Sequence, residues 1–244
     1  MGNLKNHPFA VEAFFESSLV LTFAVPKEKI RHLIPECLTL DTFNDQWAFI
    51  AVAMVDTKNL RPKGFPLFFG NDFFLAGFRI FVRYTSAAGR HLRGLYILRS
   101  ETDKKRMNFL GNLFTRYQYT LTDIKITKTP ENILVHSVQS GMDIEIQKSE
   151  NPDLPLHSPF TSWKEARRFA GPLPFTFTYH PGRREVLIVE GVREHWEPKP
   201  VRVISQKIKY IEGLPIEGTR LASAFLVEKI PYYWKKGRTE IWKP

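Results

Sequence analysis

Short segments rich in β-branched and aromatic residues recur along the whole chain, and this pattern most restricts the possible folds. Each segment is bounded by Gly, Pro, Asn, Asp or Ser, and several alternate between apolar and polar residues. Such segments are typical of β-strands that end in turns. About a dozen strands are predicted, over residues 18–25, 38–43, 47–55, 78–84, 92–98, 117–127, 133–138, 142–147, 175–179, 185–192, 201–211 and 219–228.

Helical signals are few and short. Pro26 and Pro35 delimit a short helix over 26–34, and apolar residues at helical spacing predict a second over 103–114. Ser162 and Glu165 form a capping box that begins a third. Many strands with three short helices favour a mainly β (α+β) fold, in which an antiparallel sheet system closes as a β-barrel or folds over on itself.

The chain is expected to form a single domain over residues 1–244. It contains no internal repeat, and the Pro-rich loop at 149–161 is the one candidate boundary, after which the strand pattern resumes. The apolar fraction of 43%, with 20 Phe, supplies enough bulky side chains for a sizeable core.

Cysteine usage and hydropathy predict a cytoplasmic protein. Cys37 is the single cysteine, the chain has no N-glycosylation sequon, and its first residues lack the apolar core of a signal peptide. The longest strongly apolar run, 47–55, is far shorter than a membrane-spanning helix. We therefore expect no membrane partner.

A formal charge of +10 and a pI near 9.7 favour anionic ligands. The basic residues are spread through the chain, with short clusters at 104–106 and 235–238, so nucleic acid is an unlikely partner and a basic nucleic-acid-binding protein is kept only as an alternative function. The chain has no glycine-rich phosphate loop, no G-x-S-x-G motif and no zinc motif. We expect no metal and no cofactor.

Several motifs, in the same order and at similar spacing, resemble a family of uncharacterised bacterial proteins, the YqjF-like family. They are LTFAVP at 21–26, LIPECLTLDTF at 33–43, GFRIFV at 77–82, GLYIL at 94–98, AFLVE at 224–228 and PYYW at 231–234. The resemblance spans nearly the whole chain. It implies the fold of the acetoacetate decarboxylase-like superfamily, a mainly antiparallel β-barrel around a ligand cavity.

The reaction of acetoacetate decarboxylase does not follow from this resemblance. That enzyme carries its lysine pair after a glycine-aromatic-proline step, whereas the nearest counterpart here, 111–115, contains no lysine. Lys104 and Lys105 are adjacent, and a neighbouring ammonium group lowers the pKa of a lysine for Schiff-base chemistry. A Schiff-base decarboxylase using Lys104 or Lys105 is therefore an alternative, and a solvated helix start is the competing interpretation.

Five residues are candidates for ligand binding: Arg79, Glu101, Arg116, Tyr117 and Tyr119. Arg79 lies in an aromatic strand, where its guanidinium can hold a carboxylate if it points inward and is solvated if it points outward. The resemblance implies that the region of Arg116, Tyr117 and Tyr119 borders the cavity, and Glu101 is a possible partner for either arginine.

The expected function is a pocket that binds or transforms a small carboxylated or carbonyl compound. The sequence identifies neither the ligand nor a reaction, and it leaves open whether the protein is an enzyme.

Overall fold

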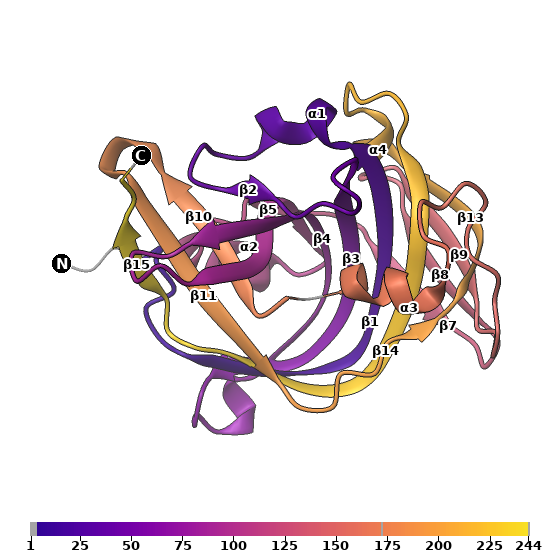
Figure 1. Ribbon diagram of the computed structural model, residues 1–244. Coiled ribbons are helices and arrows are strands. Elements are labelled where there is room, and N and C mark those ends of the chain that lie inside the picture. Colours follow the sequence, from indigo (N-terminus) through magenta and orange to yellow (C-terminus); the bar gives the residue numbers. More distant parts are fainter. Residues whose placement is uncertain (1–3, 172, 244) are drawn as a thin grey trace.

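A closed ring of strands forms the body of the protein in the computed structural model, which describes residues 4–171 and 173–243 (Figure 1). β1 pairs with β14 and β3, and β3 leads through β4 and β5 to β10 and β11. The ring closes because β11 pairs again with β14. Its strands are β1 (Val11–Pro26), β3 (Trp47–Pro62), β4 (Asn71–Thr85), β5 (His91–Thr102), β10 (Phe175–His180), β11 (Glu185–Arg193) and β14 (Arg220–Trp234). Pairing is antiparallel except between β5 and β10.

Smaller elements extend and cover the ring. β2 (Thr39–Leu40) pairs with β4, β6 (Tyr119–Leu121) with β5, β12 (Lys199–Pro200) with β14 and β15 (Arg238–Ile241) with β11. The helices are α1 (Lys27–Ile30), α2 (Lys105–Phe114), α3 (Trp163–Ala166) and α4 (Lys209–Glu212), with 3-10 turns at Arg31–Leu33, Leu67–Phe69, Arg167–Phe169 and Pro181–Arg183. None of the helices in the described ranges is long and apolar enough to cross a membrane.

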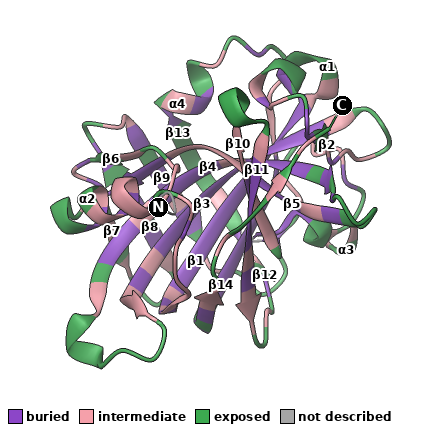
Figure 2. Ribbon diagram, turned by 90° about the vertical axis from the view of Figure 1, so that its left-hand side faces the viewer, coloured by how far each residue is buried: buried purple, intermediate pink, exposed green. Residues whose placement is uncertain are grey.

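A second sheet packs against one face of the long ring strands. It has the order β13 (Arg202–Ile208), β9 (Met142–Gln147), β8 (Asn132–Ser137) and β7 (Lys125–Lys128). Its buried aliphatic side chains, such as Val135 and Ile144, form one core with Leu21, Val52 and Ile80 of the ring. Because both faces of the ring strands are covered, β1 and β3 are buried at every position over residues 17–25 and 48–55 rather than alternately, as Figure 2 shows by their long buried stretches.

A separate core fills part of the ring interior. Phe49, Phe81, Phe160 and Phe169 pack with ring centroids 4.1 to 6.5 Å apart, a spacing favourable for aromatic pairs. Along the ring strands, side chains that face this interior alternate with side chains that face the second sheet.

A buried aspartate anchors the 3-10 turn that carries Phe169. Asp41 is 0% exposed and accepts hydrogen bonds from Arg83 of β4, Arg93 of β5 and Arg168 of the turn. The Arg83 Nη2 lies 2.7 Å and the Arg168 Nη2 3.2 Å from the carboxylate. Charge pairing at a fully desolvated carboxylate thus fastens the turn to two ring strands.

The predicted mainly β fold with a few short helices is confirmed, and local differences have tertiary causes. The predicted strand 117–127 is divided into β6 of the ring sheet and β7 of the second sheet, because the chain crosses between sheets there. Asn44 and Asp45, between the predicted strands 38–43 and 47–55, form a turn with positive φ of 51° and 52°. Only Phe43 and Trp47 bridge across it, and β2 pairs with β4 instead.

Candidate functional site

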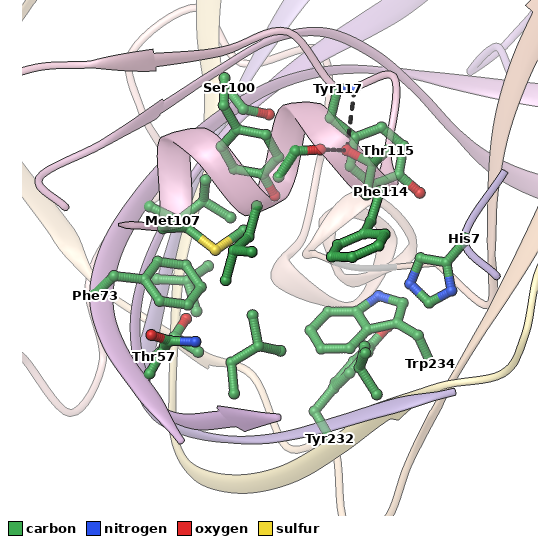
Figure 3. A pocket seen from close by; sticks show the side chains of 18 of the residues that line it. His7, Thr57, Phe73, Ser100, Met107, Phe114, Thr115, Tyr117, Tyr232 and Trp234 are labelled. Atoms are coloured by element: carbon green, nitrogen blue, oxygen red, sulfur yellow. Dashed lines mark hydrogen bonds between the residues drawn. The ribbon is translucent and has the colours of Figure 1, made fainter. Parts of the chain in front are cut away.

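An apolar cavity of about 390 Å³ lies inside the ring, between α2 and the inward faces of β1, β3, β4 and β14. Figure 3 shows Phe73 of β4, Phe114 of α2 and Trp234 of β14 pointing into it from different sides. Most of the wall's surface is apolar, and polar side chains such as Thr57 and Ser100 interrupt it. A mostly apolar cavity with a small number of polar groups is the usual form of a small-molecule site.

Arg79 is the buried cation of this cavity. The side chain is half-buried and its Nε is fully buried, and among the described residues it has neither a carboxylate within salt-bridge distance nor a hydrogen bond donated by that Nε. Burial lowers the pKa of Arg79, and the nearby tyrosines Tyr232, Tyr119 and Tyr117 oppose this shift only in part. An enclosed cation without a protein counter-charge is costly unless a ligand supplies an anion.

The three tyrosines around Arg79 come from separate elements. Tyr117 follows α2, Tyr119 begins β6, and Tyr232 lies near the end of β14. Burial raises the pKa of all three, that of Tyr119 to about 12, although the Arg79 cation, and for Tyr232 more strongly Arg193, works in the opposite direction. The phenols therefore stay protonated at neutral pH and present O–H donors.

Three glycines make room for these side chains. A Cβ atom at Gly77 would lie 2.9 Å from the Nε and Nη2 atoms of Arg79, two residues along the same face of β4. A Cβ at Gly111 of α2 would overlap the ring of Tyr119, and one at Gly191 of β11 would overlap the hydroxyl of Tyr232. Arg79 and the tyrosines can pack as they do because each of these three elements has a glycine, with no side chain, at the contact.

His7 forms part of the cavity wall beside Phe114 and Trp234 (Figure 3). Its backbone N–H donates to the Phe114 carbonyl at 3.0 Å, and its own carbonyl accepts from Gly237 N–H at 2.9 Å. Burial lowers the pKa of the imidazole, although hydrogen bonds with the backbone of His7 and Phe9 act in the opposite direction. A neutral imidazole keeps one ring nitrogen as an acceptor.

Three of the five candidate residues lie together at this cavity: Arg79, Tyr117 and Tyr119. Arg116 is not among the residues that line it. Glu101 belongs to the other face of β5, because Leu98 and Arg99 form a bulge opposite Phe78 and Arg79.

Glu101 has a different partner from those expected. Its carboxylate is 1% exposed and lies 2.9 Å from the Nη2 of Arg99, so it pairs with neither Arg79 nor Arg116. Burial raises the pKa of Glu101, with Arg99 and Ser140 opposing the shift.

The adjacent lysines lie outside the cavity wall. Lys104 and Lys105 are exposed at the start of α2, and Lys104 pairs with Asp103 at 3.0 Å. No lysine is among the described residues that line the cavity. Within residues 4–171 and 173–243, no group of three His, Cys, Asp or Glu side chains is arranged to hold a metal ion.

Sequence reasoning missed Tyr232 and His7. Tyr232 stands in the PYYW motif, but only the pairing of β14 with β1 shows that it, rather than Tyr233, faces inward beside Phe15, with ring centroids 4.8 Å apart. His7 precedes the first strand and carries no motif, so no signal in the sequence singles it out.

The family comparison covers most of the chain. The model of DUF2071, described as an uncharacterized conserved protein, matches residues 13–238. No protein in the curated set matches the chain.

Solved structures with the same fold are acetoacetate decarboxylase-like. An acetoacetate decarboxylase from Legionella pneumophila has a TM-score of 0.64 at 9% identity, covering 96% of this chain and 88% of that one. An acetoacetate decarboxylase-like enzyme from Sphingomonas wittichii gives 0.56 at 11%, with coverages of 98% and 94%. The enduracididine biosynthesis enzyme MppR complexed with pyruvate gives 0.53 at 9%, with coverages of 95% and 89%. These likenesses confirm the predicted acetoacetate decarboxylase-like fold.

Proposed function

The chain belongs to the DUF2071 family of uncharacterized conserved proteins, and we propose that its ring cavity binds a small carboxylated or carbonyl compound through Arg79. The observation that carries the proposal is a guanidinium at the cavity wall whose Nε is buried and which has no protein counter-charge among the described residues. A ligand carboxylate supplies that charge and accepts two parallel N–H donors from the guanidinium.

The polar groups beside Arg79 are of a kind that suits such a ligand. Tyr117, Tyr119 and Tyr232 remain protonated, so their hydroxyls donate to carboxylate or carbonyl oxygens. The same donors stabilise negative charge that develops on a carbonyl oxygen during a reaction. Much of the rest of the wall is apolar, including Phe73, Phe114 and Trp234, and suits a ligand with an apolar body and a single acidic group.

Schiff-base decarboxylation is the weaker alternative. It requires a lysine amine in contact with the substrate carbonyl, and the cavity wall in the described ranges has none. Treatment with a keto acid and borohydride is expected to leave the protein mass unchanged. A stable adduct on Lys104 or Lys105 would restore the decarboxylase hypothesis.

The direct test is a thermal-shift screen of the purified protein against keto acids, hydroxy acids and other monocarboxylates. Pyruvate is a suitable first compound because MppR, which shares the fold, is complexed with it. Selective binding to the folded state raises the unfolding midpoint. We expect stabilisation by one class of acids in the wild type and none in Arg79→Gln.

Two controls separate this result from non-specific binding. Arg83→Gln removes a guanidinium that pairs with Asp41 outside the cavity wall, and it should retain the ligand-induced shift. Short oligonucleotides at low and high salt test the nucleic-acid alternative, which predicts a shift that salt abolishes. If Arg79→Gln responds to the same acids as the wild type, the proposed site is wrong.

A further inference from the structure

The loop between β3 and β4 presents large apolar side chains to solvent. Phe65, Leu67, Phe68 and Phe69 are all exposed, Phe68 to 79%, and the loop projects away from the ring (Figure 1). A cluster of this kind on a protein surface marks an interaction site more often than isolated apolar residues do.

The loop is held in this arrangement by specific contacts at its base. The Arg61 guanidinium donates to the carbonyls of Phe65 at 2.9 Å and Asn59 at 3.0 Å, and pairs with Glu12 at 2.7 Å. Within the loop, Gly70 N–H donates to the Leu67 carbonyl at 2.8 Å. These bonds order the backbone without covering the apolar side chains, so their exposure is a property of the folded loop.

The same loop edges the mouth of the cavity. Of the described residues that line the cavity, Phe65, Phe69 and Arg106 are the exposed ones, so the mouth opens between the loop and α2. Phe109, also exposed, lies three residues beyond Arg106 and therefore on an adjoining part of the helix surface.

The surroundings of this mouth are basic. Lys63 of the loop and Lys105 and Arg106 at the start of α2 are exposed, and α2 itself contains no acidic residue. Lys104, which precedes them, is exposed but pairs with Asp103. The charge of the whole chain is +10. A second copy of this chain would be repelled, whereas an anionic surface would be attracted.

We propose that the apolar loop 63–70 and the basic start of α2 together dock the cavity mouth onto the surface of an anionic lipid bilayer. Aromatic side chains enter the boundary between headgroups and acyl chains, while the lysine and arginine side chains pair with anionic headgroups. The sequence-based expectation of no membrane partner rested on the lack of a spanning segment, which concerns insertion and not surface contact.

The test is co-sedimentation of the full chain with vesicles of phosphatidylcholine alone or mixed with phosphatidylserine, at low and high salt. The wild type is expected to bind the mixed vesicles and to be released by salt. Phe68→Ser is expected to weaken binding about tenfold, from the lost burial of one aromatic side chain. Lys63→Gln is expected to weaken it about fivefold.

Leu156→Ser is the matched control. Leu156 is 83% exposed in a different loop and does not line the cavity, so its substitution removes similar apolar surface outside the proposed docking surface and should leave vesicle binding unchanged. Thermal unfolding of each variant verifies that the fold is retained.

Three results would overturn the proposal. They are absence of vesicle binding, equal binding to both vesicle types, and equal loss in Phe68→Ser and Leu156→Ser. Self-association that Phe68→Ser abolishes, without vesicle binding by the wild type, would assign the surface to a second copy of the chain instead.

Discussion

Replacing Arg79 by methionine is expected to stabilise the protein while it removes ligand binding. The Arg79 guanidinium is held in an apolar cavity without a counter-charge among the described residues, and burial lowers its pKa. Methionine has a similar unbranched chain and no charge to desolvate. A gain of about 1 to 3 kcal/mol in unfolding free energy follows from removing an uncompensated buried charge. For a chain of this size, that corresponds to a rise in Tm of about 2 to 12 °C.

The same substitution at Arg99 provides the comparison, because this arginine lies on the neighbouring strand but has a partner. Its Nη2 is 2.9 Å from Glu101, whose carboxylate is 1% exposed. Arg99→Met leaves that carboxylate without its cation, and we expect a loss of about 1 to 3 kcal/mol at neutral pH. Burial already raises the pKa of Glu101, so the loss should shrink as the pH falls and the carboxyl binds a proton.

Thermal and urea unfolding at pH 7, followed by circular dichroism, measures both variants against the wild type. Near-ultraviolet spectra check that the aromatic packing of the ring interior is unchanged. Opposite shifts are expected, upward for Arg79→Met and downward for Arg99→Met. A fall for Arg79→Met as large as that for Arg99→Met would refute the reasoning, since it would mean that Arg79 has a stabilising protein partner.

Three further substitutions test other parts of the structure. In Gly111→Ala, the added methyl overlaps the Tyr119 ring. Overpacking costs about 1 to 3 kcal/mol and the higher helix propensity of alanine returns about 1 kcal/mol, so the free energy of unfolding should fall by about 0 to 2 kcal/mol. Ligand binding, measured by thermal shift, should also weaken. The pKa of His7 in the folded protein lies below its ordinary value of 6.5, so below that pH the unfolded chain binds more protons than the folded one and the free energy of unfolding falls on acidification. In unfolding titrations, His7→Gln should reduce the slope of unfolding free energy against pH by at most about 1.4 kcal/mol per pH unit. Asp41→Asn leaves three arginines around a neutral side chain and should cost about 3 kcal/mol in urea unfolding, whereas a change under about 0.5 kcal/mol would show that the cluster contributes nothing.

The β-rich architecture and three of the four α-helices could be predicted because they depend on local patterns, whereas residues 209–211, predicted as the end of a strand, begin α4. The capping box at Ser162, for example, is present as expected, with its hydroxyl 3.3 Å from the Glu165 backbone nitrogen. Apolar runs with turn residues between them restrict the backbone wherever they occur, so the predicted strands in 78–84 and 92–98 form the β4 and β5 hairpin. The order in which strands join a ring depends on distant pairings, such as β11 with β14, which no local pattern encodes.

The candidate site divides in the same way. Arg79 in an aromatic strand was a recognisable candidate from the sequence, and the tyrosines after α2 followed from the resemblance. Only the tertiary structure decided that Arg79 faces inward, that Glu101 faces the opposite way across a β-bulge, and that Tyr232 and His7 join the cavity from the two ends of the chain. The physical reason is that a strand has two faces, and a one-residue shift in pairing exchanges them. The sequence therefore determines the chemistry of each side chain, whereas the register of strands far away along the chain determines its surroundings.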